Sequence, residues 1–184
     1  SGGFGAWRLR ACYEDEYDED NDFQRIRFEP IYDADTSVYF DLDAKRQDKA
    51  DARHCWVVYS QDRQSYTDEW GDDPASWPKN INTDYFDWCT PDVVYLAEYY
   101  RVEEKRETLQ VWTIDGKEER FFDPDEDKLL ELETDPLSVF VRSKKVKRRR
   151  IHKYLMSGGR VLEDQGYIAG KCIPIIPYYG KRWF

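Results

Sequence analysis

Long apolar runs are missing from this chain of 184 residues. The two longest, Cys55 to Tyr59 and Val93 to Ala97, are five residues each, whereas a helix that crosses a bilayer needs about 18. Proline (8) and glycine (10) are too scarce for a disordered or collagen-like chain, and aromatic residues make up 16% of the sequence. We therefore expect a soluble, folded chain with an aromatic-rich core and no membrane segment.

Cysteine and methionine are also scarce. The four cysteines are Cys12, Cys55, Cys89 and Cys172. They form no C-x-x-C pair and are too sparse for a disulfide scaffold, so buried free thiols are expected. Met156 is the only methionine and the chain opens at Ser1, so we expect a piece of a longer polypeptide.

Sequence signatures of catalysis are missing as well. No G-x-S-x-G, Walker loop or G-x-G-x-x-G occurs, and Gly158-Gly159 is typical of a turn. His54 and His152 lie outside any metal-ligand spacing. We therefore predict no catalytic residue, no metal site and no cofactor, and we do not expect an enzyme.

Two acidic patterns could hold a cation. Seven of the nine residues in 14–22 are acidic, but they lack the spacing and the glycine of a calcium loop, so we interpret them as a solvated hairpin tip. Pro91-Asp92 followed by Glu103 and Lys105 is similar to a metal-nuclease signature. The same acid-x-Lys tripeptide recurs three times elsewhere, so it discriminates little in a chain with 36% charged residues.

Charge is divided unevenly along the chain. Residues 1–135 carry 16 basic and 36 acidic side chains, net −20, whereas residues 136–184 carry 12 basic and 2 acidic, net +10. If the two parts lie on different faces, one subunit presents complementary surfaces to a copy of itself. The alternative is that they pair within the chain.

Apolar residues mostly alternate with polar ones, which predicts strands. The expected strands cover residues 7–13, 25–31, 38–42, 55–59, 93–102, 108–114, 117–122, 137–155, 160–163 and 173–179. Asp115-Gly116 predicts a hairpin turn. Pro174 and Pro177 confine the last segment to a sheet edge or to an irregular extended path. Fold class is therefore α+β, a predominantly antiparallel β-sheet with a few short helices, in one domain over residues 1–184.

Short helices are expected in two places. One lies near residues 62–70, within a segment (62–92) that is otherwise expected to be irregular and held by aromatic side chains. The other follows Asp123-Pro124, where Asp123 would cap the helix and Pro124 would be its first residue. This helix would end near Thr134.

A basic run near the C-terminal quarter contains the candidate functional residues. They are Lys144, Lys145, Lys147, Arg148, Arg149, Arg150 and Lys153. Because strand side chains alternate, about half of them could face one ligand, either a neighbouring subunit or the DNA backbone. The alternative is cross-strand pairing with acidic residues such as Glu103, Glu104 and Glu107. A nucleic-acid-binding or metal-dependent nuclease domain stays open as a second function, and a carbohydrate-binding β domain rests only on abundant Trp and Tyr.

Five strings of residues carry a family resemblance. They are Gly5-Ala6-Trp7-Arg8-Leu9 with Tyr13-Glu14-Asp15, Lys49-Ala50-Asp51-Ala52-Arg53-His54-Cys55, Ala97-Glu98-Tyr99-Tyr100 leading into Val102-Glu103-Glu104-Lys105, Lys147-Arg148-Arg149-Arg150 with Lys153, and Ile168-Ala169-Gly170 through Ile173-Pro174-Ile175-Ile176-Pro177 to Trp183-Phe184. In order and approximate spacing the chain resembles the portal proteins of short-tailed, lambdoid Salmonella-type phages, over nearly all of its length.

The resemblance implies a fragment, the wing region, with the stem, clip, crown and barrel beyond Phe184. It implies a ring, commonly of twelve copies, at one capsid vertex, through which DNA enters and leaves without chemistry in the ring. The implied partners are copies of the chain, the packaging terminase, scaffolding, coat and tail-adaptor proteins, and double-stranded DNA. The implied location is the virion, with assembly in the bacterial host cytoplasm. The wing would use residues 147–150 for subunit packing or internal pairing more than for DNA.

Overall fold

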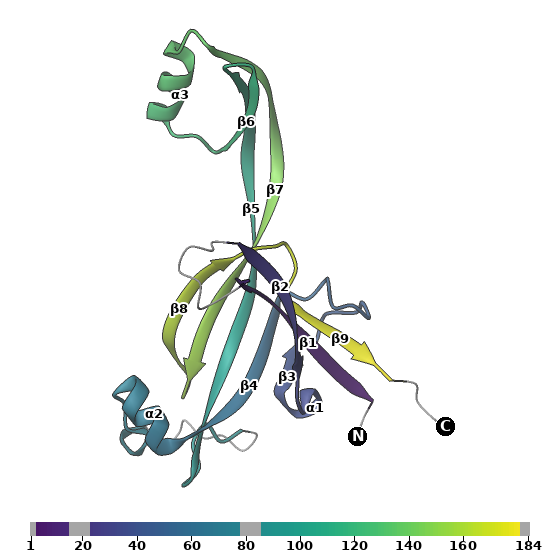
Figure 1. Cartoon of the computed structure of the whole chain (residues 1–184), viewed down its shortest axis with the longest axis vertical. Helices are drawn as coiled ribbons and strands as arrows, with labels where there is room; N and C mark the ends of the chain where they lie inside the picture. The colour runs from purple at the N-terminus through teal and green to yellow at the C-terminus, as the bar shows by residue number, and fades with distance from the viewer. Residues whose placement is uncertain (1–2, 15–22, 78–85, 181–184) are drawn as a thin grey trace. The chain divides into compact units, whose positions relative to one another are not determined.

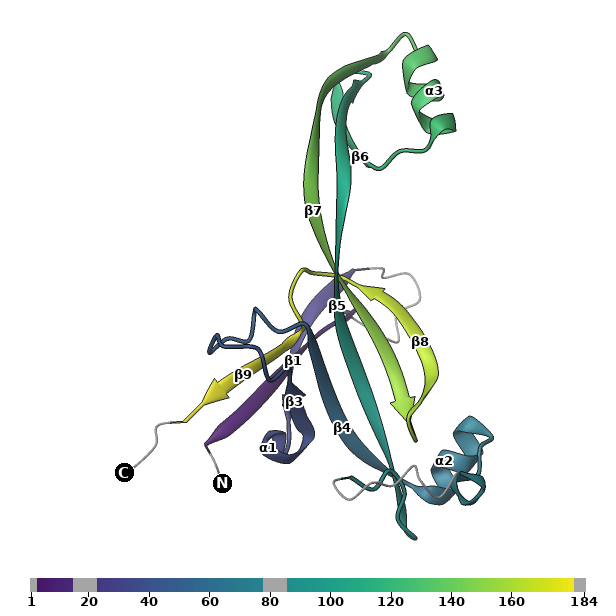
Figure 2. The ribbon, with the colours of Figure 1, turned by 180° about the vertical axis from the view of Figure 1, so that it is seen from behind.

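The chain folds mainly into strands joined by short helices (Figures 1 and 2). The computed structural model describes residues 3–14, 23–77 and 86–180. The strands are β1 (Phe4–Tyr13), β2 (Gln24–Ile31), β3 (Val38–Phe40), β4 (His54–Asp62), β5 (Val93–Ile114), β6 (Lys117–Phe122), β7 (Ser138–Ser157), β8 (Arg160–Ile168) and β9 (Ile175–Tyr179). The helices are α1 (Ala34–Ser37), α2 (Arg63–Trp70), the 3-10 helix η1 (Pro74–Ser76) and α3 (Glu126–Thr134). The predicted α+β class with mainly antiparallel sheets is confirmed.

The strands form two sheets. One has the order β2-β1-β9, and the other has the order β3-β4-β5-β7-β8, with β6 pairing with β5. In the first sheet β1 pairs antiparallel with both neighbours, so that Ala6 lies opposite Ile31 on one side and Pro177 on the other. The prolines of β9 are compatible with this position because an edge strand needs hydrogen-bond donors on one side only. The predicted edge location of this segment is confirmed.

The chain is organised as two compact units. Unit 1 comprises residues 1–103 and 150–184, and unit 2 comprises residues 104–149. β5 and β7 contribute residues to both units. Side chains from both sheets form the main core of unit 1: Ala6, Cys55, Val57, Tyr100, Ile151 and Ile175 are each at most 2% exposed.

A second core cluster of unit 1 holds α2 in place. Tyr66 is fully buried and packs with Val94, Leu96 and Leu155. Asp72 accepts hydrogen bonds from the Tyr66 hydroxyl (3.3 Å) and from Trp77 Nε1 (2.7 Å), and it forms an ion pair with Arg160 of β8. The predicted helix near 62–70 is confirmed, and aromatic side chains hold the turn that follows it. Residues 78–85 lie outside the described chain.

Unit 2 is a three-stranded sheet with one helix. It contains residues 104–114 of β5, all of β6 and α3, and residues 138–149 of β7. Its core comprises Val111, Trp112 and Leu132, which are 1%, 6% and 2% exposed. Trp112 meets the Phe140 ring edge-on at 5.3 Å between centroids. In both views α3 lies on the β6 side of this sheet (Figures 1 and 2), and Lys128 of α3 covers the Phe121 ring of β6.

Two tight turns have the conformation that their residues favour. Asp115 and Gly116 both have positive φ (50° and 76°), which a primed hairpin turn requires, so the predicted turn is confirmed. Gly158 joins β7 to β8 with φ 56°, and a Cβ there would lie 2.9 Å from the Trp77 ring. Glycine is therefore needed at this turn both for its backbone conformation and for the space that the indole occupies.

Three local predictions were wrong. β5 is one strand of 22 residues, because the charged residues between 102 and 108 continue the alternation without breaking the sheet. The strand expected at 38–42 ends at Phe40, and Leu42 is 94% exposed. Asp125, not Asp123, caps α3, with its side chain accepting from the Lys128 backbone N–H.

The cysteines agree only in part with the expectation, and most of the acidic run lies outside the described residues. The four thiols are free, as expected, but only Cys55 is buried, so the expectation of buried thiols was wrong for the other three. Burial raises the pKa of the Cys55 thiol. In the acidic run only Glu14 is described, and Asp15 to Asp22 lie outside the described residues.

Candidate functional site

The basic run lies on β7, where its residues have three different environments. Residues 144–149 belong to unit 2, whereas Arg150 and Lys153 belong to unit 1. Some of these cations pair with acids of β5, some lie over aromatic rings, and two are exposed without an ion pair in the described chain. A cation whose charge is already neutralised within the chain is less available to a partner than one that is exposed and has no ion pair.

Two cations of unit 2 pair across strands, which was one of the two alternatives that the sequence left open. Lys147 Nζ lies 2.5 Å from the Glu104 carboxylate of β5. The Arg148 guanidinium lies 3.3 Å from the carboxylate of Glu107 and 4.3 Å from the centre of the Phe122 ring. Glu107 is 4% exposed, so Arg148 neutralises a buried acid, whereas the Lys147 pair is exposed to solvent on both sides. Cross-strand pairing with Glu104 and Glu107 is confirmed.

Two cations of unit 1 also have partners within the chain, Lys153 in an ion pair and Arg150 over an aromatic ring. Lys153 Nζ lies 3.1 Å from the Glu98 carboxylate, which also binds Arg8 of β1 at 2.7 Å and accepts a hydrogen bond from the Tyr100 hydroxyl at 3.0 Å. Burial is the main cause that raises the pKa of Tyr100. Arg150 lies over the Tyr167 ring, 5.4 Å from its centre. The Arg8–Glu98 ion pair therefore joins the two sheets of unit 1, and Lys153 shares the same carboxylate from within the sheet of Glu98.

Lys144 and Lys145 differ from the other cations of the run. Both are exposed, and within the described residues neither side chain forms an ion pair or a hydrogen bond. Arg142, two positions earlier on the same strand, is exposed and equally without an ion pair in that part of the chain. We call these three side chains, Arg142, Lys144 and Lys145, the basic edge. They are available to a partner because no acid of the described chain pairs with them.

The third predicted acid, Glu103, binds an aromatic cluster instead of the basic run. It accepts a hydrogen bond from the Tyr167 hydroxyl at 2.7 Å, which raises the pKa of Tyr167. His152 lies between the rings of Tyr154 and Tyr167, with centroid distances of 4.1 and 4.6 Å. His152 Nε2 is 2.5 Å from Asp164, and this hydrogen bond lowers the pKa of that carboxyl.

This cluster extends across the sheet and was not predicted. The Trp56 ring of β4 stacks on Tyr99 of β5 at 4.2 Å, and Tyr99 lies 6.1 Å from Tyr154 of β7. Strand register places two of these ring pairs directly opposite each other, Trp56 with Tyr99 and His152 with Tyr167. Only the strand register, which the sequence leaves open, could have revealed this cluster.

The nuclease-like constellation is not assembled. Asp92 directly precedes β5, and Glu103 lies on that same strand eleven residues later, so the strand separates them by roughly 35 Å. Lys105 points to other acids of unit 2, with Glu107 at 3.8 Å and Asp123 at 3.5 Å. Among the described residues no group of three His, Cys, Asp or Glu side chains could hold a metal ion.

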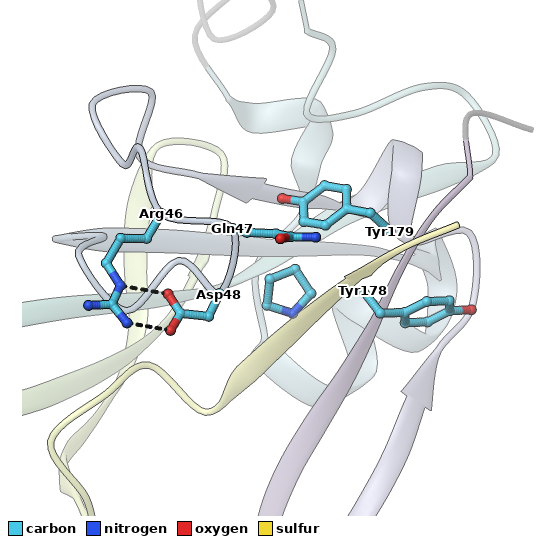
Figure 3. Close-up of a pocket in the computed structure, with 6 residues that line it drawn as sticks. Arg46, Gln47, Asp48, Tyr178 and Tyr179 are labelled. Carbon is cyan, nitrogen blue, oxygen red and sulfur yellow. Dashed lines mark hydrogen bonds and ion pairs between the residues drawn. The ribbon is translucent and has the colours of Figure 1, made fainter. Parts of the chain in front are cut away.

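A shallow hollow lies between the 46–48 loop and β9 in unit 1 (Figure 3). Tyr178 and Tyr179 project to different sides of β9, and Gln47 lies beside Tyr179. Arg46 donates two hydrogen bonds to Asp48, at 2.9 and 2.7 Å, and this contact lowers the pKa of Asp48 to about 2. The hollow is open to solvent, and its one ion pair is satisfied within the loop.

The described chain is an α+β module of mainly antiparallel sheets. Its long strand β7 exposes the cations Arg142, Lys144 and Lys145. In the part of the chain that the structure describes, no helix is both long and apolar enough to cross a membrane. The chain belongs to the Phage P22-like portal protein family, whose family model matches residues 1–184. This family is structural rather than enzymatic, and the resemblance seen in the sequence is confirmed.

One curated relative is a portal protein of Acyrthosiphon pisum secondary endosymbiont phage 1. It is 38% identical over 189 residues, an alignment that covers 100% of this chain and 26% of the relative. The chain thus spans about a quarter of the length of the relative that it matches.

Proposed function

We propose that this chain is the wing region of a portal subunit, a longer polypeptide whose copies form a ring, commonly of twelve, at one vertex of a phage capsid. DNA passes through this ring during packaging and on release. The observation that supports the proposal most strongly is the family match over all 184 residues. The wing contributes two sheet-based units and a charged strand edge, and it carries out no chemical step.

The proposed partners follow from a ring at the capsid vertex. They are copies of the same subunit, the packaging terminase, scaffolding, coat and tail-adaptor proteins, and double-stranded DNA in the channel. The subunit is made in the bacterial host cytoplasm and resides in the virion. No metal or cofactor is part of the proposal.

Ring formation by the full-length gene product tests the proposed function. We expect closed rings of about twelve subunits in negative-stain images and a matching sedimentation coefficient, because repeated heterologous contacts close into a ring when their rotation allows it. A full-length product that stays monomeric at micromolar concentration would contradict the proposal.

Salt dependence separates this function from nucleic-acid binding. Each phosphate neutralised by a protein cation contributes about −0.9 to the slope of log affinity against log salt. The three cations of the basic edge, Arg142, Lys144 and Lys145, form no ion pair among the described residues and therefore predict a slope no steeper than about −3 for duplex DNA. Binding of DNA by all seven candidate residues would give a slope of about −6. Filter binding between 50 and 200 mM salt, a range of about fourfold, measures it. A slope near the steeper value would favour the nucleic-acid-binding alternative.

A further inference from the structure

One border of the unit 2 sheet has no strand beside it. Within the described residues, the unit 2 part of β7 pairs only with β5, because β8 pairs with β7 only from Ile151 onward. The outward backbone groups of residues 138–149 therefore lack a strand partner in that part of the chain. Such an edge is a template for pairing with another chain unless the protein covers it.

The beginning of this edge is apolar as well as open. Leu137, Val139, Phe140 and Val141 are 61%, 61%, 49% and 47% exposed. Successive strand residues point to opposite faces, so both faces of the sheet expose apolar surface here. The exposed cations Arg142, Lys144 and Lys145 follow directly, so the border combines an apolar half with a basic half.

The other side of the same unit offers the matching chemistry. A hollow between β6 and α3 combines aromatic and acidic side chains; it is lined by Phe121, Phe122, Asp123, Pro124, Asp125, Asp127, Lys128 and Glu131. Lys128 lies over the Phe121 ring and pairs with Glu131, whereas Phe122 and Asp127 are parts of the lining that remain exposed. Residues 115–135 carry ten acids and three bases. In the described chain Glu118, Glu126 and Asp127 form no ion pair or side-chain hydrogen bond.

Within one molecule Arg148 of β7 reaches this hollow, with its guanidinium 4.3 Å from the centre of the Phe122 ring, whereas Lys144 and Lys145 form no ion pair in the described chain. β5 lies between β6 and β7, so the two borders are about 10 Å apart and face away from each other. This separation exceeds the Debye length of about 8 Å in physiological salt, so attraction through one sheet is largely screened. Direct contact of Lys144 and Lys145 with the acids of the hollow therefore requires a second molecule.

We infer that residues 137–145 of one copy dock into the β6–α3 hollow of a second copy of this chain. The apolar residues Val139 and Val141 pack against the exposed part of Phe122, and Lys145, on the same face of the strand, meets the acidic rim. Lys144 lies next to it with its side chain on the opposite face and meets acids at the border of the hollow. The two surfaces differ, so the contact is heterologous and repeats from copy to copy, and the inference rests on the proposed ring in this respect. A DNA backbone would pair with the lysines but would leave the apolar residues exposed.

The test uses charge exchange in the full-length protein. Lys144→Glu/Lys145→Glu and Glu126→Lys/Asp127→Lys reverse the charge of the two sides, the second pair at and beside the rim of the hollow, at exposed residues that hold no ion pair in the described chain. Arg148 is unsuitable as a probe because it neutralises the buried Glu107. Lys45→Glu/Lys171→Glu is the matched control, since it makes the same change of charge at exposed positions of unit 1. Sedimentation velocity measures assembly, and thermal melts verify that each variant is folded.

Each double variant is expected to raise the concentration needed for assembly about tenfold or more, because like charges then meet across the interface. Combining the two double variants restores assembly, and the control assembles as the wild type does. If Lys144→Glu/Lys145→Glu forms rings like the wild type, or if the combination does not restore them, the inference is overturned while the proposed function stands. Loss of DNA binding with intact rings also overturns it. A monomeric wild-type protein overturns both.

Discussion

Replacing Glu98 by alanine is expected to lower the free energy of unfolding by about 3–5 kcal/mol. The Glu98 side chain is 12% exposed and lies between Arg8 of β1 and Lys153 of β7, at 2.7 and 3.1 Å. Alanine leaves both cations, 25% and 20% exposed, without their shared counter-charge. Arg8 Nε already has no hydrogen-bond partner, so the guanidinium has little other compensation. Urea titration followed by far-UV circular dichroism measures the change.

Glu29→Ala is the matched control for this prediction. Glu29 also faces an arginine, Arg10 on β1, but at 3.8 Å and with both side chains well exposed, so its removal should cost about 0–1 kcal/mol. Glu98→Gln keeps the shape and the hydrogen-bond acceptor while removing the charge. Equal losses for Glu29→Ala and Glu98→Ala would show that Glu98 does not compensate the two cations.

The sequence predicted the features of the fold that depend on local chemistry. Asp115-Gly116 allows one common hairpin turn, and a proline-bearing strand such as β9 fits an edge. The partners of the basic run were also predictable in part, because Glu104 and Glu107 belong to an acidic segment between two predicted strands, 93–102 and 108–114. Turn residues, prolines and alternating charges act over a few positions in the sequence. Their effects can therefore be predicted without knowing which strands pair.

Features that depend on register or on competing contacts could not be predicted. The cap of α3 is an example: Asp123 has the sequence of a cap, but its side chain instead accepts a hydrogen bond from the Thr108 backbone N–H at 2.6 Å, and its φ is 41°. Asp125 then caps the helix. The contacts of Glu98 with Arg8, and of Asp72 with Arg160, likewise join segments whose pairing no local pattern specifies. The two units left no trace in composition because they share β5 and β7.

Arg148→Glu is the second substitution with a large expected effect, about 3–5 kcal/mol of unfolding free energy. Glu107, with a side chain 3% exposed, would lose the guanidinium at 3.3 Å and face a new carboxylate. Lys105 remains 3.8 Å from Glu107, but its side chain is 71% exposed and holds its charge in solvent. The stacking of Arg148 on Phe122 would also be lost. Hydrogen exchange should localise the loss to unit 2.

The neighbouring Lys147→Glu provides the control, because it makes the same change of charge one residue away. Its partner Glu104 is 42% exposed, and solvent-exposed pairs contribute about 0–1 kcal/mol. Similar losses for the two variants would contradict the distinction between a buried acid and a surface pair. If Arg148→Glu alone strongly lowers the free energy of unfolding, failure of this variant to assemble would reflect unfolding of unit 2. It would then say nothing about a contact with a partner. The interaction of the basic edge with a partner must therefore be measured at Lys144 and Lys145, whose charges no acid of the described chain neutralises.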